Sequence, residues 1–257
     1  MLVTNPQIKH GVLKFGFTPD EEIGRGANHF DVKKFGAKYA YTVDGSELGE
    51  ISTETFSADG AVIKFHGVSM HPGTAKGKLI NSQKMAAYFL SLLPRDRLSP
   101  ETTEGKEGFV HPTTMSGNEE LTTLNMIIRD FDNKKLKQHG DYLRALVDRT
   151  VKAFPKGARG EIEIKEQYRN MKEIIDKHPI IEKNALIAMN KLGIKPIKFP
   201  VRGGTDGSRL SFMGLPCPNI FDGGQNFHSN SEWASLQDMQ KAADLVVKIA
   251  EVYEETA

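Results

Sequence analysis

The sequence predicts an α/β fold into which a second, α+β domain is inserted. Residues 1–55 and 177–257 mix short apolar strands, glycine-rich turns and amphipathic helices. Residues 56–176 instead run strand, helix, strand, strand, helix, strand, which is the order of a ferredoxin-like split βαβ unit. Because insertions are tolerated where the two ends of the inserted unit lie close together, we expect residues 1–55 and 177–257 to form one domain around it.

Two strands and one short helix are predicted in the first part. Residues 12–17 form an apolar run typical of a core strand, and residues 37–43 alternate apolar and polar side chains. Between them, glycine-rich residues 24–28 indicate a turn and residues 30–35 suit a short helix. This part therefore opens as α/β structure.

The inserted block is predicted to hold four strands and two helices. We expect strands over residues 61–68, 108–115, 121–131 and 160–168, the middle two joined in a hairpin by a turn at 116–119. The first helix begins at a cap, Asn81 or Ser82. The second helix is defined by apolar residues that share one face: Leu136, Leu143, Val147, Val151 and Phe154.

The last part of the sequence is again predicted to alternate helices and strands. A helix is expected over residues 179–192 and a strand over 194–201, followed by a glycine-rich stretch. A short strand at 218–221 and a final helix over 236–253 complete the predicted elements.

Composition excludes several classes of function. Lys and Arg number 34 against 33 Asp and Glu, and no dense basic run is present, so we expect no nucleic-acid partner. No apolar run approaches the roughly 20 residues that span a bilayer, and the start of the sequence lacks a signal-peptide pattern, so no membrane role is expected. Cys217 is the single cysteine, which excludes an internal disulfide and a Cys-rich zinc module. We therefore expect a cytoplasmic protein.

A run of three carboxylates, residues 20–22, directly follows the first predicted strand. Adjacent negative charges repel one another unless they are solvated, cap a helix or bind a cation, and one of them can become a proton acceptor with a raised pKa. Acidic residues at a helix start are the simpler interpretation. Two further residues strengthen the alternative of a site: Asp44 follows the strand at 37–43, and His228 comes just after the strand at 218–221.

Ligands gather at the carboxyl ends of strands in open α/β sheets, so Glu21, Glu22, Asp44 and His228 are expected to converge there. Carboxylate and imidazole donors without thiols suit zinc, manganese or cobalt in a hydrolytic site. Taken singly, Asp44 with its following glycine is also an ordinary turn signal, and a lone histidine is often a surface residue.

Three other positions carry side chains with possible functional roles. Arg202 precedes a glycine-rich loop and offers a planar guanidinium suited to a carboxylate, although a surface ion pair explains it equally well. The loop does not have the spacing of a nucleotide-binding motif. His71 is expected in a turn after the first strand of the inserted block. His139, two residues before Asp141, is expected on the surface of a helix.

The motifs TPDEEIGRG, YTVDG, GVSMHPG, RGGTDGSRLS and GGQNFHS, in this order around a ferredoxin-like block, resemble the zinc-dependent aminoacylase and exopeptidase family, and within it the aminopeptidases that act on tripeptides. The resemblance covers essentially the whole chain. It implies a zinc-exopeptidase α/β/α catalytic domain, of which part is present here, with an inserted dimerisation or lid domain over residues 56–176.

The resemblance also implies roles for individual residues. Glu21 corresponds to the general base, Glu22 and His228 to ligands of one zinc, and Asp44 to a ligand of the other. Arg202 corresponds to the residue that grips the carboxylate of the peptide. His71 and Asn125 correspond to inserted-domain residues that reach the active site of a partner subunit, which implies a homodimer.

The sequence departs from the family pattern in one respect. Family members carry a His-x-Asp ligand motif and a bridging Asp upstream of the Glu-Glu pair, and this sequence has neither. We therefore expect that an N-terminal segment is missing, that the chain alone is inactive and that it binds zinc weakly. A non-catalytic dimerisation or peptide-binding fragment, and a related dipeptidase or deacylase, are the alternatives.

Overall fold

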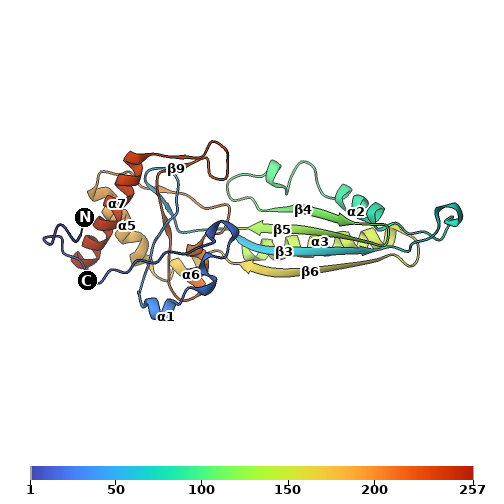
Figure 1. Ribbon diagram of the computed structural model, residues 1–257, viewed down its shortest axis with the longest axis horizontal. Helices are drawn as coiled ribbons and strands as arrows, with labels where there is room; N and C mark the ends of the chain where they lie inside the picture. The colour runs from blue at the N-terminus through green and yellow to red at the C-terminus, as the bar shows by residue number, and fades with distance from the viewer. Residues whose placement is uncertain (1, 257) are drawn as a thin grey trace. The chain divides into compact units, whose positions relative to one another are not determined.

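The computed structural model describes residues 2–256 and divides into two compact units (Figure 1). The first unit comprises the residues up to Thr55 and those from Asn170 onward, and the second runs from Phe56 to Arg169. The sequence places residues 170–176 in the inserted block, whereas they lie in the first unit. They belong there because the Thr55 N–H donates to Asn170 Oδ1 at 3.1 Å and the Met171 N–H donates to Thr55 Oγ1 at 3.2 Å.

The second unit contains one antiparallel sheet with the strand order β4-β5-β3-β6. Its strands are β3 (Ser57–His66), β4 (Phe109–Gly117), β5 (Leu121–Asp130) and β6 (Arg159–Tyr168). The first and last strands of the unit, β3 and β6, lie side by side, and the hairpin β4-β5 completes the sheet. This is the ferredoxin-like arrangement that the strand and helix order predicts.

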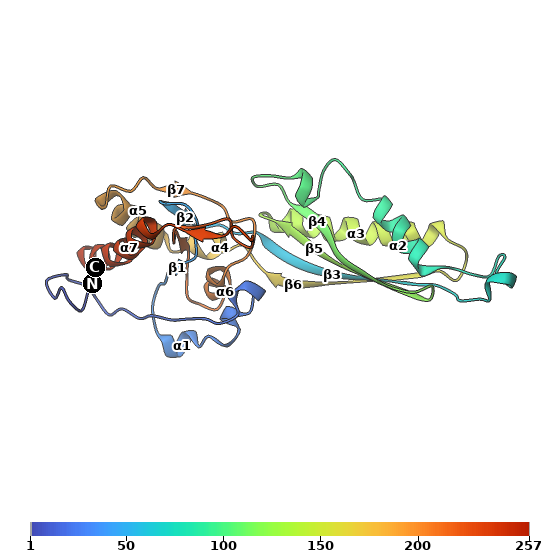
Figure 2. The ribbon, with the colours of Figure 1, turned by 45° about the horizontal axis from the view of Figure 1, so that its top comes forward.

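Helices α2 (Ser82–Ser91) and α3 (Asn133–Ala153) cover one face of this sheet (Figure 2). Asn81 caps α2 by accepting the Lys84 N–H at 3.1 Å, as predicted. Both helices bury apolar side chains against the sheet in one core that includes Phe65, Phe89 and Leu143. Two short 3-10 helices, η3 (Pro72–Thr74) and η4 (Pro100–Thr102), lie in the connections. The second unit therefore has a complete core of its own.

His139 departs from its expected place on the surface of α3. Its side chain is only 17% exposed, and Nε2 lies 2.8 Å from Oδ2 of the buried Asp130. Asp141, the partner that the sequence spacing suggests, instead pairs with Lys137. The pairing differs because Asp130 ends β5, on which α3 packs, and such a contact between elements leaves no local sequence signal.

The first unit contains a mixed sheet with the order β1-β8-β2-β7. Its strands are short: β1 (Thr42–Val43), β2 (Glu50–Ser52), β7 (Ile197–Lys198) and β8 (Asn219–Ile220). The pairs β1-β8 and β2-β7 are parallel, while β2 and β8 are antiparallel. The strands expected over 37–43, 194–201 and 218–221 are present only as these shorter pairings.

Two long helices of the first unit, α5 (Pro179–Lys191) and α7 (Leu236–Glu255), pack against each other and close a core with Ile51 and Phe221. The remaining elements are α1 (Val32–Phe35), α4 (Lys172–Ile175), α6 (Asp206–Phe212), η1 (Glu21–Ile23), η2 (Gly26–His29), β9 (Gly224–Gln225) and β10 (Trp233–Ala234). Among residues 2–256, none of the helices combines the length and apolarity that crossing a membrane requires.

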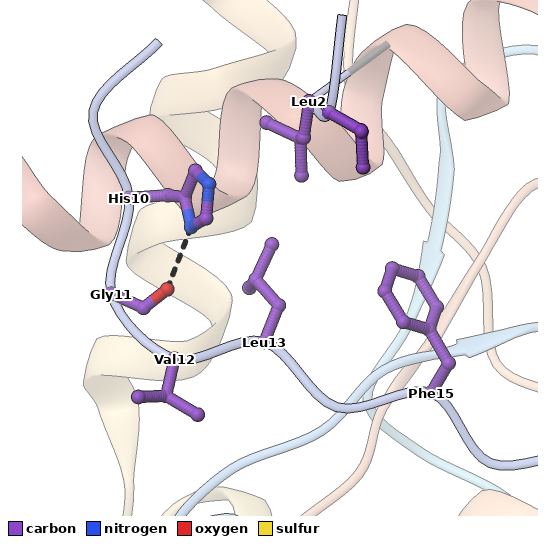
Figure 3. A pocket seen from close by; sticks show the side chains of 7 residues that line it. Leu2, His10, Gly11, Val12, Leu13 and Phe15 are labelled. Atoms are coloured by element: carbon purple, nitrogen blue, oxygen red, sulfur yellow. Dashed lines mark hydrogen bonds between the residues drawn. The ribbon is translucent and has the colours of Figure 1, made fainter. Parts of the chain in front are cut away.

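The core strand predicted at residues 12–17 is wrong. These residues form no strand, and Phe15 and Phe17 are 70% and 93% exposed. An apolar run becomes a strand only when a neighbouring strand supplies hydrogen-bonding partners, and no strand within the described residues pairs with it. The preceding chain folds back instead and forms an open pocket with Leu2 and Leu13, in which His10 Nδ1 lies 2.7 Å from the Gly11 carbonyl oxygen (Figure 3).

Candidate functional site

Two parallel strands bring acidic residues to one edge of the sheet in the first unit. Asp44 follows β1 and Asp222 lies two residues beyond β8, so both come from the carboxyl ends of parallel neighbours. The Asp44 N–H donates to the Ile220 carbonyl at 3.1 Å. At Gly45 a Cβ atom would lie 2.7 Å from Phe221 Cα, so the chain passes β8 this closely only with glycine at that position.

Asn219 fixes the backbone beside Asp44. Its buried side chain donates to the Asp44 carbonyl at 3.2 Å. Its Oδ1 accepts hydrogen bonds from the Thr42 hydroxyl at 2.7 Å and from the Thr205 hydroxyl at 3.1 Å. Since Thr205 is the cap residue of α6, this network links the end of β1 to the start of that helix.

Glu21 and Glu22 lie on η1, in a tight turn. Asp20 before it and Gly24 after it both adopt the left-handed conformation, with φ of 61° and 66°. The Gly24 N–H closes the turn on the Glu21 carbonyl at 2.7 Å. Aspartate is among the few residues other than glycine that adopt the left-handed conformation readily, so Asp20 suits this position.

His228 comes from the opposite end of the sequence and contacts Glu22. It lies in the loop between β9 and β10, where Nε2 is 2.9 Å from Glu22 Oε2. Both side chains are well exposed, at 73% and 75%. His228 also has positive φ, 63°, and its backbone N–H donates to Glu232 Oε2 at 3.0 Å. The loop thus presents the imidazole toward η1.

The carboxylates around this contact repel one another. Desolvation by surrounding protein atoms and the charges of Asp206 and Glu22 raise the pKa of Glu21. Desolvation, followed by the charges of neighbouring carboxylates, raises the pKa of Asp44 to about 7. The side chain of Asp44 is accessible to solvent, which screens part of the repulsion that raises its pKa. A concentration of negative charge of this kind favours a bound cation.

The donor chemistry fits a divalent metal, but the number of donors is small. Glu22 and His228 offer an oxygen and a nitrogen at one point, and Asp44 offers a further carboxylate. Within residues 2–256, however, no group of three or more His, Cys, Asp or Glu side chains is arranged to hold one metal ion. The described residues therefore supply part of a metal site.

Asp206, which the sequence patterns do not single out, contacts the segment that carries Glu21 and Glu22. It is 4% exposed, and it accepts hydrogen bonds from the Thr18 hydroxyl and the Ala27 N–H. A Thr-Asp pair at the start of a helix indicates only a cap and a favourable first residue. No sequence signal shows that the carboxylate turns toward residues 18–27.

Arg202, His71 and Asn125 complete the set of predicted residues. Arg202 is half-buried in the loop that precedes α6. In the second unit, His71 precedes η3, and its Nδ1 accepts the Gly73 N–H at 3.1 Å, which leaves Nε2 to carry the ring proton. Asn125, exposed on β5, donates to the Thr114 hydroxyl at 2.7 Å.

Comparison with known proteins adds a family assignment for part of the chain. Residues 53–155 match the family model described as the peptidase dimerisation domain. This range covers most of the second unit, including β3, both helices and the hairpin.

Curated relatives match along nearly the whole sequence. Peptidase T of Exiguobacterium sibiricum is 51% identical over 256 residues, which are 100% of this chain and 62% of that protein. Peptidase T of Caldanaerobacter subterraneus is 49% identical, and the match covers 98% of this chain and 61% of that protein. The chain therefore spans about 62% of the length of these relatives.

Solved structures share the fold. The aminopeptidase PepT from Bacillus cereus superposes with a TM-score of 0.82 at 23% identity, over 98% of this chain and 67% of that one. A tripeptidase from Staphylococcus aureus gives 0.82 at 21% identity, over 99% and 67%. A dinuclear metal-binding peptidase of the M20 family from Bacillus subtilis gives 0.63 at 16% identity, over 94% and 65%.

Proposed function

We propose that this chain, which resembles peptidase T along nearly its whole length, forms the larger part of a metal-dependent aminopeptidase that removes the N-terminal residue from tripeptides. The observation that carries the proposal is the contact between Glu22 and His228, with Glu21 next to it on the same turn. Residues about 200 positions apart in the sequence thereby bring a carboxylate, an imidazole and a second carboxylate to one place.

Glu21 is the general base of the proposed reaction. The raised pKa means that this carboxylate holds a proton more readily than an ordinary glutamate does. Half-buried beside the exposed Glu22–His228 pair, it takes a proton from the attacking water and delivers it to the leaving amine. A divalent metal, when bound, supplies polarisation of the scissile carbonyl and acidification of water.

Zinc is the proposed metal because the resemblance of the sequence motifs implies it, and imidazole and carboxylate donors without thiols are compatible with it. Glu22 and His228 would hold one ion and Asp44 the other. Three donors are fewer than two ions require, so we infer that the chain alone binds zinc weakly and is inactive as a peptidase.

Residues for substrate recognition are proposed in both units. Arg202 would bind the C-terminal carboxylate of the peptide, since a guanidinium can form two parallel hydrogen bonds with it. His71 and Asn125 would stabilise the oxyanion in the active site of a partner subunit, and His71 has Nε2 as its donor because Nδ1 is engaged. The match to a dimerisation domain supports a homodimer. We place the enzyme in the cytoplasm, which is supported by its single, buried cysteine.

One alternative function is favoured by a specific observation. With no three-donor metal group among the described residues and a matched dimerisation domain, the chain could serve as a non-catalytic dimerisation or peptide-binding fragment. A dipeptidase or deacylase of related fold is the other alternative.

A chimera tests the proposal. This chain would replace the matching segment of Exiguobacterium sibiricum peptidase T, to which it is 51% identical, and the product would be assayed on di-, tri- and tetrapeptides. We expect zinc-dependent activity on tripeptides, a loss of about 10²-fold or more in Glu21→Gln, and little change in Glu254→Gln, an exposed carboxylate on α7. A folded chimera that binds two zinc ions but cleaves no tripeptide would refute the proposed substrate.

A further inference from the structure

Asp206, the first residue of α6, has both carboxylate oxygens engaged. Oδ2 accepts a hydrogen bond from the Thr18 hydroxyl at 2.6 Å, and Oδ1 accepts one from the Ala27 N–H at 3.0 Å. Because the carboxylate is buried, loss of either hydrogen bond would leave a polar group without a partner and would cost free energy of folding.

The two donors bracket the turn that carries Glu21 and Glu22. Thr18 stands three residues before Glu21, and Ala27 stands five residues after Glu22, so one side chain joins both ends of the segment. Gly26 permits this approach, because a Cβ at that position would lie 2.1 Å from Asp206 Oδ2. Burial of Gly26 and Ala27 against this carboxylate fixes the second end of the segment.

The neighbouring residue, Thr205, helps to anchor the backbone of Asp44. Thr205 donates to Asn219, which in turn donates to the Asp44 carbonyl. Thr205 and Ser208 also form a capping box that fixes the start of α6. Two consecutive residues of one rigid helix start therefore hold the backbone of both acidic segments.

We propose that Asp206 is a positioning residue: by joining Thr18 to Ala27 it holds the Glu21–Glu22 turn in register with Asp44 and His228. This inference rests on the proposed function for the roles of the residues that it positions. The hydrogen bonds and the register do not depend on a bound metal, so they can be tested without activity.

The test is hydrogen–deuterium exchange on the metal-free chain of 257 residues. In Asp206→Ala we expect the amides of residues 18–27 to exchange about tenfold faster or more, while those of α5 and α7 in the same unit keep their rates. Asp206→Asn keeps an Oδ1 acceptor for the Ala27 N–H, so the amides of residues 18–27 should retain most of their protection from exchange. Asp132→Ala is the matched control, since Asp132 also accepts backbone N–H groups but lies in the second unit.

Thr18→Ala provides a milder variant in case Asp206→Ala does not fold. It removes one of the two bonds, and we expect faster exchange confined to the segment between Thr18 and Ala27. Unchanged exchange there, or exchange that rises equally throughout the first unit, would overturn the positioning role.

The chimera separates this inference from the proposed function. In it, Asp206→Ala should lower kcat by about 10²-fold through misplacement of Glu21, with little change in the KM for tripeptide. If Asp206→Ala speeds exchange only in residues 18–27 while the chimera without this substitution is inactive, the positioning role of Asp206 is supported and the proposed peptidase reaction is refuted. Unchanged kcat in an active chimera would contradict the positioning role.

Discussion

Asp44 shows how a single residue at the site depends on its charged surroundings. In the folded chain its pKa rises from 3.8 to about 7, first through desolvation and then through nearby carboxylates. Because the folded state holds the proton more tightly than the unfolded state, Asp44 costs little stability below about pH 4. Its cost grows as the pH rises toward 7 and is complete above that.

Replacement of Asp44 by Asn should therefore stabilise the metal-free chain at pH 8 and leave its stability at pH 4 nearly unchanged. We expect a gain of about 1 kcal/mol at pH 8, well below the full value for this shift because the side chain is exposed. Urea denaturation in the presence of a chelator measures it, with the exposed Asp148→Asn as control. An equal gain at both pH values would show that charge is not the cause.

Cys217 is predicted to be unreactive in the folded chain. The thiol is 1% exposed, and burial raises its pKa to about 12, so almost no thiolate is present at pH 8. A thiol-specific disulfide reagent should label it at least about 100-fold more slowly in buffer than in urea. Rapid labelling under native conditions would mean that the small apolar cluster of Ala27, Leu210, Leu215 and Cys217 opens readily.

Asp44 follows a strand, β1, as the sequence predicts, whereas Glu21 and Glu22 were selected as following a strand over residues 12–17 that the structure does not contain. The structure places Glu22 and His228 in contact, 2.9 Å apart. Asp206 could not be found this way, because its partners Thr18 and Ala27 lie 188 and 179 positions away. A contact at such separation depends on the packed fold and leaves no periodic or capping signal.

The observed helices match their predicted bounds more closely than the strands of the first unit do. The cap at Asn81 and the apolar stripe of α3 are local features, so α2 begins at its predicted cap and the stripe from Leu136 to Val151 lies within α3. The alternation of β6 likewise matched its strand, residues 159–168. The run at 12–17 failed because a strand also requires a neighbour, which its own composition does not reveal.

Substitution of Leu143 tests how α3 packs in the core of the second unit. Leu143 is fully buried on α3, against the sheet, so Leu143→Ala removes buried contacts and leaves a cavity. We expect a loss of about 2–5 kcal/mol in the free energy of unfolding of this unit. The control is Asp148→Ala on the exposed face of the same helix. Equal effects of the two variants in urea denaturation would contradict the assigned packing.

The whole molecule distributes its exposed apolar side chains unevenly. All but three of the large ones exposed in the described residues belong to the first unit, the three being Val68, Met115 and Leu121. Phe17, Val12 and Leu236 are among the most exposed, at 93%, 88% and 73%. The second unit buries most of its large apolar side chains in one core, whereas the first unit leaves many of its own exposed.

This difference predicts distinct behaviour for the chain and for its second unit alone. Residues 56–169 should fold cooperatively and bind little of the apolar dye ANS, because their core is complete. The whole chain should bind ANS strongly and associate as its concentration rises. Substitution of both Phe15 and Phe17 by Ser should lower dye binding without lowering the free energy of unfolding, since neither ring is buried. Equal dye binding per residue by the whole chain and residues 56–169 would show that the uncovered surface is not confined to the first unit.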